Sequence, residues 1–393
     1  MINVLIKALD KEIEIERVLG SVSGNTKLPT VIFIGGIHGN ETSGVYALRK
    51  VLATIKQEDI PILGNIYALS GNLIALQKGV RYTKEDLNRI WTHSNIEKIN
   101  NTSLNGYSKD LNELIELYTI IKDIINTNKG PFYFIDLHTT SSQTSPFITI
   151  SDSINNRKFS SNFPVPIILG IEEYLDGTLL SFINEFGHIS LGFEAGQHYE
   201  KDSILNCEAF IWLALVYSGC AKKKEVLNYN HYKSLLTENF NLKNQFFEID
   251  YRFEIKKEDD FKMIDGFLNF DKINKNQPLA KNLNSIVKAP FKGRIFMPLY
   301  QNKGDDGFFV VTKISMFWLI LSKYFRKLHL HHLLRTLPGI RQDRNDKHTL
   351  IVNHKTAKFL ATEIFHFFGY RKKVLQNEKW VITKRDRKIR SLN

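Results

Sequence analysis

The chain has 393 residues, of which 43% are hydrophobic and 24% charged, and its formal net charge is +12. This length predicts more than one domain, and the composition excludes a disordered or low-complexity protein. No apolar run approaches the roughly 20 residues that span a bilayer, the first residues lack a signal-peptide pattern, and two cysteines are too few for a disulfide framework. We therefore expect a globular cytoplasmic protein.

The positive charge is confined to the end of the chain. Residues 311–393 contain 19 Lys and Arg against 5 Asp and Glu, whereas the rest of the chain contains 34 against 36. A basic protein is a candidate for binding nucleic acid or an anionic surface. Because the surplus lies in one segment, we predict no specific nucleic-acid partner for the protein as a whole.

In chain order, the first part of the sequence alternates between strand and helix patterns. Short apolar runs bounded by Gly, Pro or polar residues predict buried strands, and they occupy residues 30–34, 62–69, 132–137, 165–171 and 189–194. Patterns of helical period lie between and after them, at residues 42–57, 111–126 and 204–218. This alternation predicts an α/β fold with a largely parallel sheet flanked by helices.

The later part of the chain changes character twice. Short alternating stretches broken by Gly and Pro, such as GFLNFD and KGRIFMPLY, predict a small β domain. Basic helical patterns over residues 314–337 and 354–368 then predict a helical C-terminal extension, followed by a strand in the tail. We predict an α/β domain, a small β domain and a basic extension, with boundaries at residues 1–245, 246–311 and 312–393.

Residue types that bind metals lie beside two of the predicted strands. In VIFIGGIHGNETSG, His38 follows a strand in a Gly-rich turn and Glu41 lies three residues on, while in FYFIDLHTT, His138 lies at the carboxyl end of another strand. Such strand ends meet at one edge of an open α/β sheet. Two histidines and one glutamate, with a fourth position for water, form the ligand set of hydrolytic zinc sites. We therefore predict one Zn²⁺ per chain, although each short motif alone also fits an ordinary turn.

Further polar residues complete a predicted active site. Glu194 ends another apolar strand, where a carboxylate suits a general base; the alternative is a carboxylate paired with a lysine or arginine. The segment RYTKEDLNRIW contains Arg81, Asn88 and Arg89. One of the two arginines is suited to stabilise the oxyanion that forms at the scissile carbonyl, and the other is suited to bind a substrate carboxylate. The alternative is a salt-bridged loop in which Asn88 caps a helix, and Asp86 fits a residue that orients a metal ligand.

Together these motifs resemble the succinylglutamate desuccinylase and aspartoacylase family, which has a zinc carboxypeptidase-like fold. The matching segments are GGIHGNE, RYTKEDLNR, DLHTT and FEAG, and the resemblance covers about residues 1–311. It implies a zinc-dependent deacylase that cleaves the amide bond of a small N-acyl amino acid or a related anionic substrate. The implied roles are zinc ligation by His38, Glu41 and His138, catalysis by Glu194, carbonyl polarisation by Arg81, and substrate binding by Asn88 and Arg89.

The resemblance has departures. Aspartoacylases carry an arginine ten residues before the catalytic glutamate, where this chain has Asn184. They also bring a tyrosine from the C-terminal domain, where this chain reads GDDG, with Tyr300 nearby in sequence. A carboxypeptidase-type metallopeptidase acting on a peptide with a free C-terminus is the alternative function, because it uses the same zinc site.

The basic C-terminal segment leaves two interpretations open. Phe317 and Trp318 lie among basic residues and suit a weak contact of residues 314–335 with an anionic surface. The alternative is a helix whose apolar side packs on the catalytic domain and whose basic side faces water. The cations in question are Lys323, Arg326, Lys327, Arg335, Arg371, Lys372 and Lys373.

Overall fold

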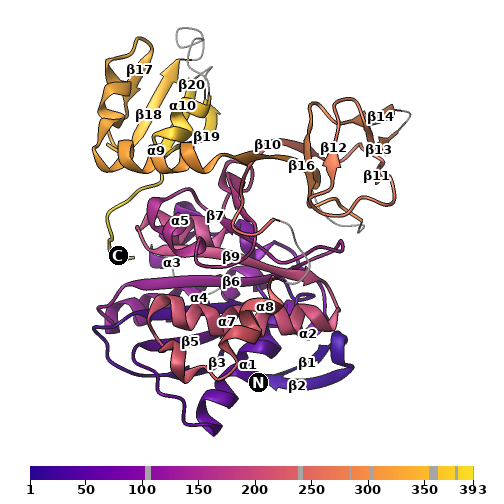
Figure 1. Ribbon diagram of the computed structural model, residues 1–393, viewed down its shortest axis with the longest axis vertical. Helices are drawn as coiled ribbons and strands as arrows, with labels where there is room; N and C mark the ends of the chain where they lie inside the picture. The colour runs from indigo at the N-terminus through magenta and orange to yellow at the C-terminus, as the bar shows by residue number, and fades with distance from the viewer. Residues whose placement is uncertain are drawn as a thin grey trace.

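The computed structural model describes residues 1–101, 108–237, 242–283, 285–300, 305–353, 362–376 and 379–392. Figure 1 shows a large α/β body from which two smaller lobes project. We call the strands from β11 to β15 the β lobe, and the segment from α9 to β20 the C-terminal lobe. In the described part of the chain, no helix is long and apolar enough to cross a membrane.

A mixed sheet runs through the body and continues into the β lobe. Its described strands lie in the order β12, β15, β16, β10, β8, β7, β9, β6, β4, β5, β3. β4, β5, β6 and β9 are parallel to one another, whereas β7 is antiparallel to β9. The bounds are β3 Val18–Val22, β4 Thr30–Gly35, β5 Asn65–Ser70, β6 Phe132–Thr140, β7 Phe147–Ile150, β8 Ile167–Leu169, β9 Ile189–Gln197, β10 Phe246–Glu254, β12 Lys272–Ile273, β15 Gly293–Phe296 and β16 Asp306–Ile314. A separate hairpin, β1 Ile2–Ile6 and β2 Lys11–Ile15, precedes them.

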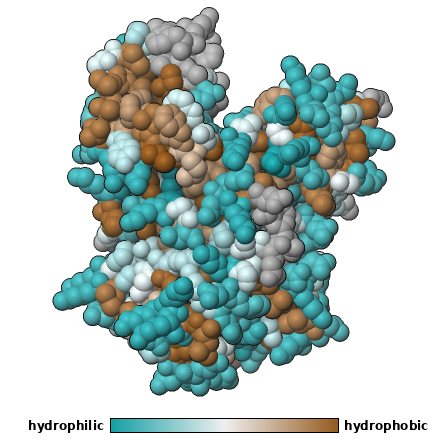
Figure 2. All heavy atoms as spheres, viewed as in Figure 1, coloured by the Kyte–Doolittle hydropathy of each residue, from teal (hydrophilic) through white to brown (hydrophobic). Residues whose placement is uncertain are grey.

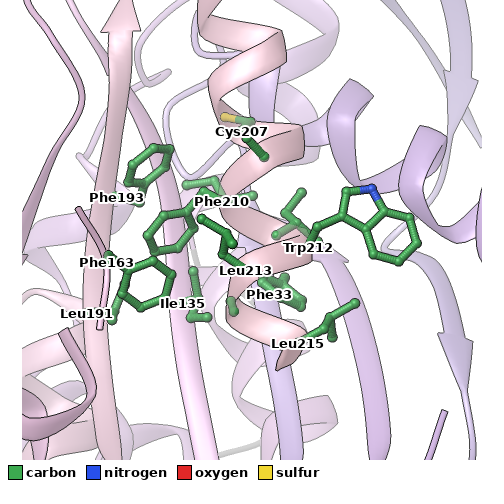
Figure 3. Packing of buried hydrophobic residues seen from close by; sticks show 14 of the residues in the cluster. Phe33, Ile135, Phe163, Leu191, Phe193, Cys207, Phe210, Trp212, Leu213 and Leu215 are labelled. Carbon is green, nitrogen blue, oxygen red and sulfur yellow. The ribbon is translucent and has the colours of Figure 1, made fainter. Parts of the chain in front are cut away.

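Helices cover both faces of this sheet because its strands are apolar on both sides. In β4, Val31 and Phe33 belong to a core with α1 and α7, while Ile32 and Ile34 face the opposite core with α4 and α6. Figure 3 shows the first core, where the ring of Phe210 from α7 packs between two other phenylalanines. The helices of the body are α1 Ser43–Gln57, α2 Leu73–Lys78, α3 His93–Asn101, α4 Lys109–Thr127, α5 Ile154–Ser160, α6 Leu179–Glu185, α7 Lys201–Ser218 and α8 Tyr229–Leu235.

The predicted α/β fold class is confirmed, and the predicted strands and helices of the body lie where the sequence patterns place them. The sheet is mixed rather than largely parallel, because antiparallel pairs lie at both of its ends and between β7 and β9. Two predicted strands differ in their bounds. The strand predicted over residues 62–69 is β5, which begins at Asn65, and the strand predicted over residues 165–171 is the shorter β8, Ile167–Leu169. The two cysteines, Cys207 and Cys220, are free and buried.

The β lobe is joined to the body through shared strands. β10 pairs with β8 in parallel and with β16 in antiparallel fashion, so one sheet crosses the predicted boundary at residue 246. A second sheet of the lobe is formed by β11 Phe261–Met263, β13 Pro278–Asn282 and β14 Ser285–Lys288. The division of the chain into three domains therefore stays a prediction.

The C-terminal lobe is less helical than its sequence suggests. Besides α9 Met316–Lys327 and α10 Thr362–Phe367, its described residues form a four-stranded antiparallel sheet. Its strands pair because one face buries apolar side chains such as Leu350, Val352 and Ile382 against Phe365 of α10. The first half of the helix predicted over residues 354–368 lies outside the described residues. The strands are β17 Ile340–Gln342, β18 Thr349–Asn353, β19 Tyr370–Gln376 and β20 Lys379–Lys384.

Buried ion pairs hold the C-terminal lobe on the body. Asp152, which is 0% exposed, accepts hydrogen bonds from Arg157 of the body and from Arg326 (3.0 Å) and Arg371 (2.7 Å) of the lobe. The neighbouring positive charges keep the pKa of Asp152 well below its usual value although burial raises it. The tail returns to the body, where Tyr118 donates a hydrogen bond to the carbonyl of Leu392 (2.9 Å).

Candidate active site

Two parallel strands bring the three predicted metal ligands together. His38 follows β4 and His138 lies near the end of β6, which is the direct neighbour of β4 in the sheet. The chain turns sharply after β4 at Gly36, whose φ of +75° favours glycine. Glu41 lies just before α1, and all three side chains are buried.

The three side chains converge on a single point. Nδ1 of His38 lies 2.8 Å from Oε1 of Glu41, and Nδ1 of His138 lies 3.0 Å from Oε2. One ligand atom from each residue can be chosen so that all lie within 4.8 Å of one another. Burial raises the pKa of Glu41, but the two histidines together hold it well below its usual value. The backbone N–H of Thr139 donates to the same carboxylate (2.9 Å), which fixes its orientation.

A carboxylate holds the far nitrogen of each histidine. Nε2 of His38 lies 3.2 Å from Asp86, and Nε2 of His138 lies 2.7 Å from Asp136. Metal-binding histidines are commonly oriented by a carboxylate in this way, with the other ring nitrogen directed at the ion. The donor set therefore fits a metal ion. The sequence pointed to Asp86, but Asp136 was missed, although its position two residues before His138 on a strand places both side chains on one face.

Glu194 lies beside the histidines on the next strand. Its backbone is in register with His138, because β9 pairs with β6. Its side chain is buried, and Oε2 has no hydrogen-bond partner among the described residues. Burial raises the pKa of Glu194 to about 8, and the charges of Glu41 and Asp136 add to this effect. Among the described residues it forms no ion pair with a lysine or arginine, in contrast to the alternative considered from the sequence.

The segment from Arg81 to Arg89 forms one wall of the same site. The Arg81 guanidinium lies 3.6 Å from Glu41 and 3.4 Å from Asp86. The Asn88 side-chain oxygen accepts a hydrogen bond from the N–H of Leu179 (3.0 Å), the first residue of α6, whose N-cap residue is Thr178. Burial lowers the pKa of Arg89, and the negative charge of Asp86 opposes this shift.

These residues line one cavity of about 200 Å³. All seven predicted site residues border it, and the strands and loops of the body supply the polar side. The opposite side comes from the chain leading into β16. It contributes Met297, Pro298, Leu299, Asp305, Asp306 and Phe309.

A family model describes this part of the chain. The model of the succinylglutamate desuccinylase/aspartoacylase catalytic domain matches residues 27–206. Over these residues the chain is similar to that catalytic domain. The succinylglutamate desuccinylase of Photorhabdus laumondii is 28% identical over 138 residues, which is 34% of this chain and 40% of that protein. The enzyme of Yersinia pestis is 32% identical over 76 residues, 19% of this chain and 23% of that protein. Each match thus covers less than half of the curated relative.

Solved structures support the fold over a longer stretch. Succinylglutamate desuccinylase from Vibrio cholerae superposes with a TM-score of 0.57 at 16% identity and covers 77% of this chain and 87% of that chain. A succinylglutamate desuccinylase/aspartoacylase from Rhodobacter sphaeroides gives 0.56 at 15% identity, covering 75% and 88%. The product-bound ectoine utilization protein EutE from Ruegeria pomeroyi gives 0.54 at 17% identity, covering 74% and 87%. At these identities the likeness shows a shared fold.

Of the residues at the two departures from the family pattern, Asn184 and Tyr300 do not border the cavity, whereas Asp305 and Asp306 of the GDDG segment do. Asn184 is buried within α6, while Leu180 and Ser181 of that helix line the site. Tyr300 instead donates hydrogen bonds to backbone carbonyls of the β lobe. The structure adds His198, which the sequence analysis did not single out; its Nδ1 lies 2.7 Å from Oγ1 of Thr139. In the sequence, the only indication that His198 belongs to the site is its position four residues after Glu194, in FEAGQH.

Proposed function

We propose that the chain is a zinc-dependent deacylase that hydrolyses the amide bond of a small N-acyl amino acid or a related carboxylate-bearing substrate. The observation that carries this proposal is the convergence of His38, Glu41 and His138 on one point beside Glu194, whose Oε2 has no hydrogen-bond partner among the described residues. The match of residues 27–206 to the catalytic-domain model of a family of deacylases supports the same reaction class.

The donor set suits zinc in particular. Two imidazole nitrogens and one carboxylate are common ligands of catalytic Zn²⁺, which keeps a further position open. When bound, Zn²⁺ supplies a Lewis acid that polarises the scissile carbonyl and lowers the pKa of water. Asp86 and Asp136 would hold His38 and His138 with their Nδ1 atoms directed at the ion.

Glu194 is the proposed general base. Its carboxylate takes a proton from the attacking water as the carbon–oxygen bond forms. It returns the proton to the amine nitrogen as the carbon–nitrogen bond breaks, so the products are a carboxylic acid and an amine. Because no lysine or arginine is paired with it among the described residues, its carboxylate is available for both transfers.

The proposed substrate contacts lie on the wall formed by residues 81–89. Arg81, which lies beside Glu41, donates to the carbonyl oxygen as negative charge develops on it. Arg89 and the amide N–H₂ of Asn88 bind the substrate carboxylate. The side-chain oxygen of Asn88 remains engaged by α6, which keeps its amide group oriented.

The size of the cavity favours a small substrate over a peptide. Its volume of about 200 Å³ is bounded by Met297 and Leu299 from the chain before β16. A carboxypeptidase needs room for several residues of an extended chain, whereas an acylated amino acid needs only the space of two small groups.

The test combines metal content with activity. The purified protein should contain about one zinc per chain, and His38→Ala or His138→Ala should lose it. Glu194→Gln should keep the metal and lose most hydrolysis, about 10²–10⁴-fold, whereas the exposed control Glu200→Gln should retain both. Substrates should include amino acids with monocarboxylic and dicarboxylic acyl groups, and peptides with a free C-terminus. Cleavage of the peptides alone would overturn the deacylase proposal, and full activity of Glu194→Gln would overturn the role of Glu194.

A further inference from the structure

Helix α9 presents an apolar face to solvent. Phe317, Ile320, Tyr324 and Leu328 follow one another at intervals of three or four residues, which places them on one side of the helix. Phe317, Tyr324 and Leu328 are 63%, 59% and 68% exposed. The sequence alternative of a helix whose apolar side packs on the catalytic domain therefore holds for Leu319, which belongs to the core of the body, but not for these four residues.

The opposite side of α9 explains this unusual orientation. Leu319, Ser322 and Arg326 are its buried residues. Ser322 donates a hydrogen bond to the carbonyl of Phe367 (2.6 Å), and Arg326 forms the buried ion pair with Asp152 (3.0 Å). The side of the helix that carries Leu319 and these two polar side chains thus faces inward, and this orientation leaves Phe317, Tyr324 and Leu328 outside.

The apolar face extends beyond the helix. Met316 and Trp318 at its start and Leu333 in the following 3₁₀ helix, Leu330–Thr336, are also more than half exposed. Figure 2 shows hydrophobic residues gathered over the C-terminal lobe, whereas most of the body is covered by hydrophilic ones. We call these seven residues the α9 patch: Met316, Phe317, Trp318, Ile320, Tyr324, Leu328 and Leu333. Contiguous exposed apolar surface of this kind marks an interaction site.

The charges around the α9 patch decide which partner it fits. Lys313, Lys323 and Lys327 are exposed on or beside the helix. Arg341, Arg344 and Lys347 are further exposed cations of the lobe. Residues 311–393 carry 5 acidic residues against 19 basic ones, of which Arg326 and Arg371 are buried in ion pairs with the body and do not add to the surface charge. A second copy of the chain meeting this face through a two-fold axis would bring lysines against lysines, which is unfavourable. The partner that complements the α9 patch and its lysines is an apolar layer below an anionic surface.

We propose that the α9 patch docks the protein on a membrane surface that contains anionic lipid. The apolar stripe of α9 enters the boundary between headgroups and acyl chains, while the flanking lysines contact lipid phosphates. Trp318 and Tyr324 are residue types enriched at that boundary. The patch is a peripheral docking surface, and it is independent of the proposed hydrolysis.

Vesicle flotation with the full chain tests this proposal. The protein should float with vesicles of phosphatidylcholine and phosphatidylglycerol, and not with phosphatidylcholine alone, and high salt should weaken binding. The double variant Lys323→Gln/Lys327→Gln should bind about thirtyfold more weakly. Phe317→Glu/Ile320→Glu should abolish flotation. Lys56→Gln/Lys78→Gln and Leu227→Glu, which change exposed residues of the body, are the matched controls and should bind like the unmodified chain.

Two outcomes would overturn the proposal. The first is that the unmodified chain and Phe317→Glu/Ile320→Glu behave alike in flotation, whether both float or both fail to float. The other is a dimer in lipid-free buffer, measured by light scattering, that Phe317→Glu/Ile320→Glu converts to a monomer, which would assign the patch to a second copy. Unfolding curves of all variants check that the substitutions, which lie at exposed positions, leave the fold intact.

Discussion

Replacing Asp152 with Asn should destabilise the attachment of the C-terminal lobe more than any surface substitution. The carboxylate is 0% exposed, and three guanidinium groups, those of Arg157, Arg326 and Arg371, donate to it. Asn keeps the volume but removes the negative charge. Arg371 retains Glu173 and Glu248. Among the described residues, Arg326 retains one carboxylate at a longer distance, that of Asp386 (3.6 Å), besides its hydrogen bonds to backbone carbonyls. Leaving buried charges uncompensated costs about 3–5 kcal/mol of unfolding free energy.

Urea unfolding at neutral pH measures this loss, because urea adds no ions that screen the pairs. Limited trypsin digestion gives a second readout, since a detached C-terminal lobe exposes its many lysines and arginines. Asp123→Asn, at an exposed position on α4, is the control and should change the unfolding free energy by less than about 0.5 kcal/mol. If Asp152→Asn unfolds and is digested like the control, Asp152 does not hold the lobe.

Three further predictions follow from buried groups in the body. Asp136→Asn should weaken metal binding about 10–100-fold by releasing the His138 ring; competition with a chromogenic chelator measures it, and an unchanged affinity would exclude the orienting role. Phe210→Ala should lower the unfolding free energy by about 3–5 kcal/mol, because its ring packs 3.8 Å and 4.3 Å, between centroids, from two others; a loss below about 1 kcal/mol would contradict this packing. Burial lowers the pKa of His188 to about 4 from 6.5. The stability that this neutral ring contributes is complete above pH 6.5 and should decline toward pH 4 by up to about 1.4 kcal/mol per pH unit. Urea unfolding across this range should show a flatter profile for His188→Gln than for the unmodified chain.

The body of the protein could be predicted because its strands are short, apolar and buried on both faces. The runs ending near His38, His138 and Glu194 stand out against their polar flanks, and the geometry of parallel strands then brings their ends together. Asp136 escaped prediction because a single acid inside an apolar run has no periodic signal. The role of Asp136 follows only from its contact with the His138 ring, which the sequence does not show.

The C-terminal lobe was harder to predict for a different reason. The pattern of α9 is correctly amphipathic, but the pattern does not say which side docks. That choice is made by Asp152, which lies 174 residues from Arg326 in sequence. The strand predicted in the tail is β20, but its partner β18 was not predicted, because a short apolar run gains a core only through the pairing of the two strands.

The strand β10 has a consequence for how a substrate reaches the cavity. Because β10 is hydrogen-bonded to β8 on one side and to β16 on the other, the wall carrying Asp306 and Phe309 is built into the same sheet as the wall carrying Glu194. Swinging that wall aside would require breaking a continuous ladder of backbone hydrogen bonds. Entry therefore depends on side chains and short loops at the rim, and substitutions there can change which molecules are admitted while the sheet keeps the two walls at a fixed separation.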